Sequence, residues 1–135
     1  MKIALGADHR GMSSAKLIAE RLRSQGHEAE ILGESSAQAT DYPEAAFMVG
    51  SRVTSGKADL GLLVCGTGIG MSIAANKVRG VRAAVVHDEL TAQLSRSHND
   101  ANVLCLPADL LGQRLIEKIV DIWLGTPFEG GRHAR

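Results

Sequence analysis

A cysteine stands directly before a glycine-rich loop in the stretch "LLVCGTGIGMS", which spans residues 62–72. After Cys65, glycines follow at every second position (Gly66, Gly68 and Gly70), and the sequence then becomes helical. Glycines let backbone N–H groups approach a ligand closely, and the N-terminus of a following helix attracts anions, so the loop predicts an anion site. The same helix N-terminus would favour the thiolate form of Cys65, which could then act as a base.

The loop departs from the common phosphate and nucleotide motifs. No lysine follows the last glycine, as a Walker A motif requires, and the G-x-G-x-G spacing differs from the dinucleotide fingerprint. Met71 stands six positions after Cys65, where a cysteine phosphatase carries an arginine. An anion other than a nucleotide phosphate is therefore expected. Cys65 could instead be a small buried hydrophobic residue, as most free cysteines are, and Cys105 in the apolar run "VLCL" is expected to be one.

Polar residues also flank two other predicted strands. Asp8 and His9 follow the first strand, and His98 and Asn99 belong to "SHND", just before the fifth. Each pair has a simpler interpretation: Asp8 and His9 suit the turn that leads into a helix, and His98 and Asn99 suit a helix C-terminus. Tyr42, in "TDYP" (residues 40–43), is expected near the start of a helix and could line the cleft.

The basic, glycine-rich end of the chain contains Arg132, His133 and Arg135. It is either an arm that reaches the site or a tail without fixed structure. With such an arm, the residues above would supply a thiol base, an imidazole acid, an anion-binding loop and arginines. Because no group of cysteines and histidines has zinc-site spacing, no metal is predicted.

Five apolar runs alternate with helical patterns and predict the elements that position these residues. Strands are expected at residues 2–7, 27–32, 58–64, 81–86 and 102–106. Ser13 or Ser14 is expected to cap the first helix and Asp88 the fourth, and the last helix is expected within residues 108–125. Strict alternation predicts an α/β fold, a single-domain, three-layer αβα, Rossmann-like architecture with a doubly wound five-stranded parallel sheet in the order 2-1-3-4-5. In that order strands 1 and 3 are neighbours, and a crevice opens at their carboxyl ends.

Composition narrows the function classes. The 135 residues fit one domain, 1–135, in which residues 126–135 form a C-terminal arm that completes the site. A net charge of zero and an aromatic content of 3% argue against nucleic-acid binding. No apolar stretch has the length of a membrane span, the first residues lack the apolar core of a signal peptide, and the two cysteines show no disulfide framework. A cytoplasmic protein is therefore expected.

Six stretches together carry a resemblance to a known family: "IALGADHRG", "TDYP", "VCGTGIGMSIAANK", "AQLSRSHNDANVL", "IVDIWLG" and "FEGGRH". With them the sequence resembles the type B ribose-5-phosphate isomerases and, more broadly, the galactose-6-phosphate isomerase subunits, over essentially the whole chain. The resemblance implies interconversion of ribose 5-phosphate and ribulose 5-phosphate through a cis-enediolate, without a cofactor. It also implies a homodimer, or a dimer of dimers, whose sites draw residues from both subunits.

The resemblance further implies a role for individual residues. Cys65 would move the proton between C1 and C2 of the sugar, and His98 would be the acid that opens the furanose ring. Thr67 and the N–H groups of residues 66–70, which include Ile69, would hold the enediolate oxygens. The other implied contacts are those of Asp8 and Asn99 with hydroxyl groups and of His9 and Arg132 with the phosphate.

Two positions depart from the family pattern. The family commonly has an arginine near the start of the last helix, where this chain has Asp109, and its tail often has the spacing R-H-x-x-R, whereas Arg135 comes one residue early. Asp109 is expected to cap the last helix, the alternative being that it faces the sugar and changes which sugar fits. The functional alternatives are the same chemistry on a tetrose 4-phosphate, a hexose 6-phosphate or an unphosphorylated, allose-type sugar, and a sugar-phosphate-binding module without turnover.

Overall fold

The computed structural model describes residues 1–33 and 42–135 of the chain. The strands are β1 (Lys2–Ala7), β2 (Glu28–Ile31), β3 (Leu60–Cys65), β4 (Ala83–Val85) and β5 (Val103–Pro107). The helices are α1 (Met12–Ser24), α2 (Tyr42–Thr54), α3 (Ile69–Ala75), α4 (Glu89–Ser97), α5 (Gln113–Gly125) and the short 3₁₀ helix η1 (Gly131–Ala134). Every expected strand and helix is present, and most of their boundaries shift by only a few residues.

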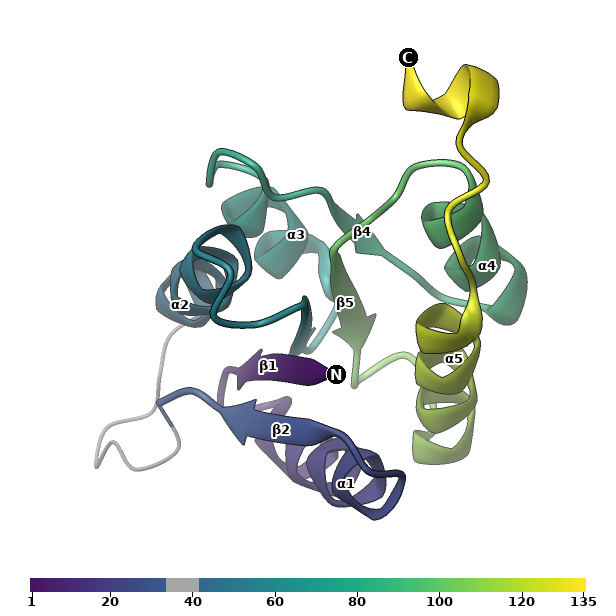
Figure 1. Ribbon diagram of the computed structural model, residues 1–135. Coiled ribbons are helices and arrows are strands. Elements are labelled where there is room, and N and C mark those ends of the chain that lie inside the picture. The colour runs from purple at the N-terminus through teal and green to yellow at the C-terminus, as the bar shows by residue number, and fades with distance from the viewer. Residues whose placement is uncertain (34–41) are drawn as a thin grey trace.

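The strands form one parallel sheet in the order β2-β1-β3-β5-β4 (Figure 1). The expected α/β class and doubly wound parallel sheet are confirmed, and β1 does lie between β2 and β3. The predicted order of the last two strands is wrong, because β5 pairs with β3 and β4 is an edge strand. Burial gives the reason: every residue of β5 is buried, whereas the residues of β4 are only partly buried. A wholly apolar strand suits the interior of a sheet, and a short, half-covered one suits its edge.

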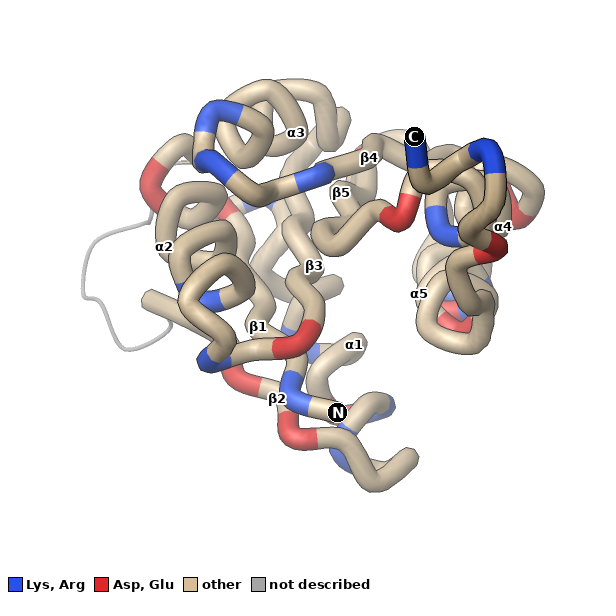
Figure 2. Tube along the Cα trace, turned by 45° about the horizontal axis from the view of Figure 1, so that its top comes forward, with Lys and Arg blue, Asp and Glu red and all other residues tan. Residues whose placement is uncertain are grey.

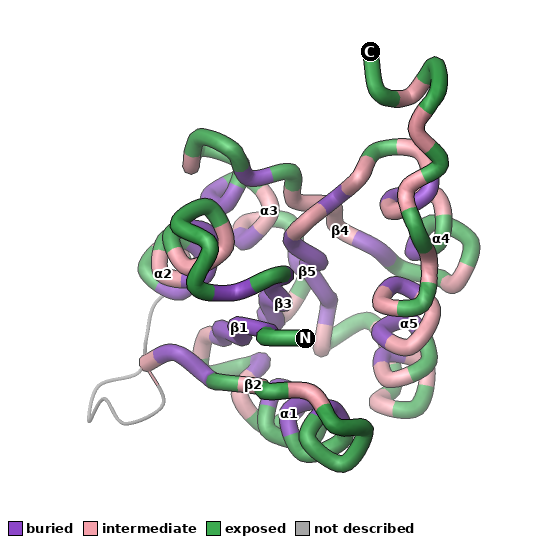
Figure 3. The backbone as a smooth tube through the Cα atoms, viewed as in Figure 1, coloured by how far each residue is buried: buried purple, intermediate pink, exposed green. Residues whose placement is uncertain are grey.

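Helices cover both faces of the sheet and make the expected three layers (Figure 1). On one face, α1 and α5 pack on the strands through buried side chains that include Leu22 and Trp123. On the other face, α2 and α3 contribute Val49 and Met71 to a second cluster. Figure 3 shows the central strands buried between these layers. The two cores hold the carboxyl ends of β1 and β3 side by side, where the candidate residues lie.

Charged residues are interspersed along the described chain. Figure 2 shows Lys and Arg residues alternating with Asp and Glu residues over the trace, in keeping with a net charge of zero. Ion pairs such as Arg21–Asp121 and Arg52–Glu30 join neighbouring elements. Within residues 1–33 and 42–135, no helix is both long enough and apolar enough to cross a bilayer.

The starts of two helices show which capping signals act. Asp88 caps α4 as predicted, since its carboxylate accepts a backbone N–H from the first turn at 2.7 Å. The predicted cap at Ser13 or Ser14 is wrong, because α1 begins at Met12 and both serines lie inside the helix. Gly11 packs so closely on the backbone of β3 that no Cβ would fit there. This close approach lets the chain enter α1 almost directly from β1.

Candidate active site

Cys65 ends β3, and its thiol lies under the glycine loop. The side chain is only 5% exposed, and the Gly68 N–H donates a hydrogen bond to its Sγ at 3.1 Å. Gly68 has a φ of +78°, in the left-handed region that favours glycine, and a Cβ there would lie 2.9 Å from Cγ2 of Val85. The loop can therefore turn back over the thiol only with glycine at this position. A backbone N–H aimed at sulfur stabilises negative charge on it, which suits a thiol that acts as a base.

Cys105 provides the internal comparison. It lies in β5 with no exposed surface, opposite Leu63 of β3 in the sheet register. Burial, with a smaller contribution from the neighbouring Cys65, raises the pKa of the Cys105 thiol. The prediction that Cys105 is a core residue is confirmed, and the two cysteines have different surroundings although both are free.

Asp8 and His9 lie at the carboxyl end of β1, beside the end of β3. The sheet register pairs Ala7 with Val64, and the Asp8 N–H donates to the Val64 carbonyl oxygen at 3.4 Å. One carboxylate oxygen of Asp8, Oδ1, accepts hydrogen bonds from the N–H groups of Arg10 and Gly11 at 3.0 Å each, which confirms the turn interpretation. Its Oδ2 makes no hydrogen bond to any described residue, so Asp8 can shape the turn and still contact a ligand. His9 is exposed beside it.

The start of α2 places an aromatic ring against the loop. A Cβ on Gly70 would lie 2.9 Å from Cε2 of Tyr42, so the ring and the loop backbone are in contact. Tyr42 therefore lies beside the glycine loop, and its place in a cleft stays a prediction, while Thr40 and Asp41 of the same motif lie outside the described residues. Residues 8, 9, 42 and 65–70 thus form one group, which we call the carboxyl-edge cluster.

Asp109 does not cap the last helix, so that prediction is wrong. Helix α5 begins at Gln113, and Asp109 lies in the turn after β5, where its N–H donates to the Gly66 carbonyl oxygen at 3.0 Å. Its Oδ2 instead accepts a hydrogen bond from Nε of Arg10 at 2.6 Å. That hydrogen bond, together with the charge of Asp109, raises the pKa of the Arg10 guanidinium. Sequence reasoning missed Arg10, because its partner is 99 positions away and no local pattern links them.

The second group lies where α4 ends and the C-terminal arm returns. The His98 N–H donates to the Leu94 carbonyl oxygen, which confirms the helix C-terminus interpretation for its backbone. The imidazole Nε2 of His98 lies 3.3 Å from Oε2 of Glu129, and its ring stacks on His133 with a centroid distance of 4.2 Å. The Glu129 N–H also donates to the Ser97 carbonyl oxygen at 2.9 Å. The arm is therefore folded onto α4, and it fixes the orientation of the His98 ring.

We call residues 98, 99 and 129–135 the amino-edge cluster, because they lie at the amino end of β5. In the register of β3 and β5, Cys65 lies opposite Pro107 and Gly61 opposite Val103, and His98 comes before Val103 in the chain. The two levels are four positions apart along each strand, which corresponds to roughly 13 Å. Figure 1 shows the α4–β5 connection and the arm near the amino end of β5, whereas α5 starts near the carboxyl end of that strand. One chain therefore does not bring His98, Asn99, Arg132 and Arg135 to Cys65.

Comparison with known proteins identifies the family. The family described as Ribose/Galactose Isomerase matches residues 3–135 of this chain. Ribose-5-phosphate isomerase B of Escherichia coli (strain K12) is 48% identical over 132 residues, which cover 98% of this chain and 89% of that protein. The chain belongs to the ribose/galactose isomerase family. The resemblance carried by the six sequence stretches is therefore confirmed.

Solved structures of ribose/galactose isomerase relatives share the fold. The structure of Clostridium thermocellum ribose-5-phosphate isomerase B has a TM-score of 0.95 and 46% identity, and the match covers 99% of this chain and 90% of that one. The structure of ribose-5-phosphate isomerase B from Mycoplasma genitalium with bound ribulose-5-phosphate has a TM-score of 0.92 and 45% identity, covering 98% and 89% of the two chains. The family match extends through the C-terminal arm, so the arm belongs to the family fold.

The amino-edge cluster of this family member contains three groups that commonly bind metals. One ligand atom each of His98, Glu129 and His133 lies within 4.8 Å of the others. The two imidazole rings are nearly parallel, with an interplanar angle of 8°. A metal ion within about 2.1 Å of a nitrogen of each ring would lie well out of both ring planes, where imidazole has no lone pair. The observed stack therefore orients His98 rather than forming a coordination site.

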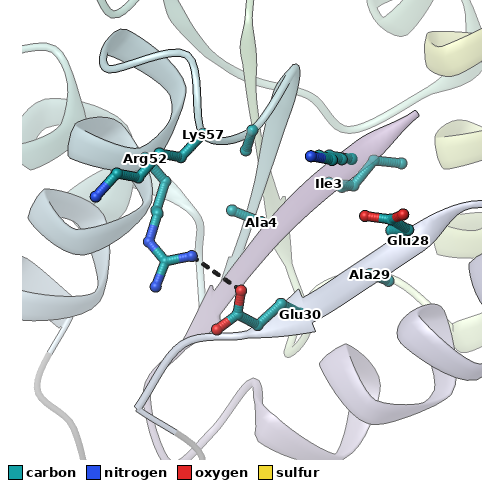
Figure 4. Close-up of a pocket in the computed structure, with 9 residues that line it drawn as sticks. Ile3, Ala4, Glu28, Ala29, Glu30, Arg52 and Lys57 are labelled. Carbon is teal, nitrogen blue, oxygen red and sulfur yellow. Dashed lines mark hydrogen bonds and ion pairs between the residues drawn. The ribbon is translucent and has the colours of Figure 1, made fainter.

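A hollow beside the first residues of β1 and β2 is separate from both clusters. The groove lies between β1, β2 and α2 and has a volume of about 250 Å³. Figure 4 shows the ion pair between Arg52 and Glu30 that crosses it, and the two charged groups are 2.9 Å apart. None of the residues that line it is a predicted site residue of this ribose/galactose isomerase family member. The groove therefore plays no part in the chemistry derived from the two clusters.

Proposed function

We propose that this protein is an aldose–ketose isomerase that interconverts ribose 5-phosphate and ribulose 5-phosphate through a cis-enediolate, without a cofactor. The observation that carries the proposal is the Cys65 thiol, held by the Gly68 N–H at 3.1 Å at the start of the glycine loop. Membership of the ribose/galactose isomerase family supports the substrate class. The cytoplasm, where thiols remain reduced, suits a reaction that depends on a free cysteine.

In this mechanism the Cys65 thiolate takes the proton from C2 of the open-chain aldose. The C2–H electron pair forms the C1–C2 double bond, and the carbonyl electrons move to O1, which becomes negatively charged. Cys65 then returns the proton to C1, while the proton of the O2 hydroxyl passes to O1, so that O1 becomes a hydroxyl group and O2 the ketose carbonyl oxygen. A positioned base contributes about 10²–10⁴-fold to the rate of such a transfer.

The loop would stabilise the charge that develops on O1 and O2. The Gly68 N–H already donates to the sulfur, and the Ile69 N–H donates to Oγ1 of Thr67 at 3.3 Å. The N–H groups of Gly66 and Gly70 and the hydroxyl hydrogen of Thr67 are therefore the donors available for the oxygens. One well-placed donor is worth about 10²–10³-fold in rate. In this proposal Asp8 contacts a sugar hydroxyl through Oδ2, His9 binds the phosphate and Tyr42 lines the cleft.

We also propose that two copies of the chain share each site. The two clusters lie at opposite edges of one sheet, so His98 of the partner subunit would serve as the ring-opening acid for a given Cys65. Asn99 and the arm arginines, Arg132 and Arg135, would come from the same partner. Support comes from Ile69 and Ile73, which are 51% and 58% exposed on one side of α3 directly after the loop. Apolar side chains in that position suit burial by a second subunit.

The negative charge of Asp109 is the reason to consider a second substrate. It stands beside Gly66, where it would repel a phosphate dianion placed next to it, and its pairing with Arg10 offsets that charge. A tetrose 4-phosphate, a hexose 6-phosphate or an unphosphorylated sugar would undergo the same proton transfer at Cys65. The choice among them depends on contacts beyond the glycine loop.

The test is turnover of a sugar panel, with ketose formation from ribose 5-phosphate as the main measurement and Cys65→Ala as the inactive control. We expect ribose 5-phosphate to have the highest kcat/KM in the panel. A higher kcat/KM for another sugar would mean that this sugar is the preferred substrate of the same proton-transfer reaction. Binding of ribose 5-phosphate without turnover of any sugar would contradict the isomerase proposal and indicate a binding module.

A further inference from the structure

An ion pair lies over the first glycine of the catalytic loop. Nε of Arg10 donates to Oδ2 of Asp109 at 2.6 Å. A Cβ on Gly66 would lie 2.7 Å from that carboxylate oxygen and 3.4 Å from the Arg10 Nε, so the pair contacts the residue that follows Cys65. The two side chains come from the ends of β1 and β5, on either side of the end of β3.

The pair has hydrogen-bonding groups left over on both sides. The two terminal nitrogens of Arg10 and Oδ1 of Asp109 make no hydrogen bond within residues 1–33 and 42–135. The two side chains are 57% and 37% exposed, so these atoms can reach a ligand. Together they offer N–H donors and a carboxylate acceptor a few ångströms apart, which is what a hydroxyl group needs because it both accepts and donates.

We propose that the Arg10–Asp109 pair is a specificity-determining element that binds a hydroxyl group of the substrate sugar, with Arg10 donating to its oxygen and Asp109 accepting its proton. The inference rests on the proposed function, in which the C1–C2 bond of the sugar lies at the glycine loop, beside the Gly66 backbone that the pair contacts. The pair has no net charge, so it is suited to a neutral hydroxyl rather than to a phosphate dianion. Phosphate recognition is left to His9 and the arm arginine Arg132.

A plain surface ion pair is the competing interpretation, and the chain contains a matched control for it. Arg21 pairs with Asp121 at 2.6 Å, with side chains that are 41% and 36% exposed. That pair joins α1 to α5, away from the loop. Its shortest nitrogen–oxygen distance and its exposure are similar to those of Arg10 and Asp109, and it has one further hydrogen bond, from Arg21 Nε to Asp121 Oδ1 at 3.3 Å. Exposed ion pairs of this kind contribute little to stability, so the residues of either pair can be substituted and the protein should still fold.

The experiment compares two charge-neutral double variants, Arg10→Met/Asp109→Ala and the control Arg21→Met/Asp121→Ala. Calorimetry measures the binding of ribitol 5-phosphate, which cannot isomerise, and of inorganic phosphate, which has no sugar hydroxyls. We expect the first variant to bind ribitol 5-phosphate at least about tenfold more weakly, as loss of hydrogen bonds to charged groups predicts, with phosphate affinity unchanged. The control variant should bind both ligands like the unaltered protein.

Three results would overturn the inference. Unchanged ribitol 5-phosphate binding in the Arg10→Met/Asp109→Ala variant would overturn it alone and leave the proposed function standing. Equal weakening of both ligands would assign the pair to the phosphate instead. Failure of the unaltered protein to bind ribitol 5-phosphate would overturn the proposed function, and this inference with it. Thermal melting checks that each variant is folded, and the single variant Arg10→Met repeats the test if the double variant is not.

Discussion

The two cysteines allow activity and stability to be separated with one kind of substitution. Cys65→Ala and Cys105→Ala each remove one sulfur atom from a buried side chain, since the residues are 5% and 0% exposed. Deleting a single buried heavy atom costs about 1 kcal/mol, which lowers the Tm of a domain of this size by about 4 °C. Both variants should therefore lose a similar, small amount of stability.

Their activities should differ greatly. Cys65→Ala removes the base and should lower kcat for ribose 5-phosphate by about 10²–10⁴-fold, whereas Cys105→Ala should keep nearly all activity. The assay is ketose formation from ribose 5-phosphate well below both melting temperatures, alongside thermal melting of each variant. Equal losses of activity in the two variants would refute the reasoning, because the Cys105 side chain is wholly buried in β5 and, within the described residues, its thiol makes no hydrogen bond to the glycine loop.

Three further predictions concern other parts of the chain. His98→Asn should slow turnover of ribose 5-phosphate far more than turnover of a tetrose 4-phosphate, which cannot close a furanose ring; equal slowing would assign His98 to binding or proton transfer. Gly68→Ala, which places a Cβ 2.9 Å from Val85 Cγ2 at a φ of +78°, should lower stability by about 2 kcal/mol, and an unchanged Tm would contradict the loop geometry. The hydrogen bond from Arg21, with Gln25 and the Arg21 charge as smaller contributions, lowers the pKa of Asp121. The ionised Asp121 therefore contributes its full stabilisation above the unfolded pKa near 3.9 and loses it as the pH falls through the lower folded pKa. Arg21→Met should thus shift the midpoint of acid unfolding to higher pH. An unshifted midpoint would show that the Arg21–Asp121 pair does not stabilise the folded protein.

Local patterns predicted the elements, and long-range pairing decided the rest of the fold. The cap at Asp88 and the core position of Cys105 follow from short stretches of sequence, and both predictions are confirmed. The order of β4 and β5 does not follow from strand–helix alternation, which is satisfied by either arrangement. The stronger signal was the apolar run of residues 103–107 compared with the mixed run of residues 81–86, since the more apolar strand takes the interior position.

The candidate site likewise has features that follow from local sequence and features that depend on long-range pairing. The position of Cys65 beside the loop follows from one contiguous motif, and the sheet places Asp8 beside it because β1 pairs with β3. The sequence around Asp109 is typical of a helix cap. In the structure, however, its N–H donates a hydrogen bond to the Gly66 carbonyl oxygen, and α5 begins only at Gln113. Its pairing with Arg10 joins residues far apart in sequence, so it becomes visible only when β1 and β5 are placed on either side of β3.

Complementation between two inactive variants tests the proposed shared site most directly. Cys65→Ala and His98→Asn chains are coexpressed with different affinity tags, and the mixed dimer is isolated by two purification steps. If each site combines Cys65 of one chain with His98 of the partner subunit, the mixed dimer holds one intact site and one site that lacks both groups. It should recover about half the activity of the unaltered dimer on ribose 5-phosphate, while each parent homodimer stays nearly inactive. A mixed dimer as inactive as its parents would contradict the shared site and require Cys65 and His98 to act within one chain.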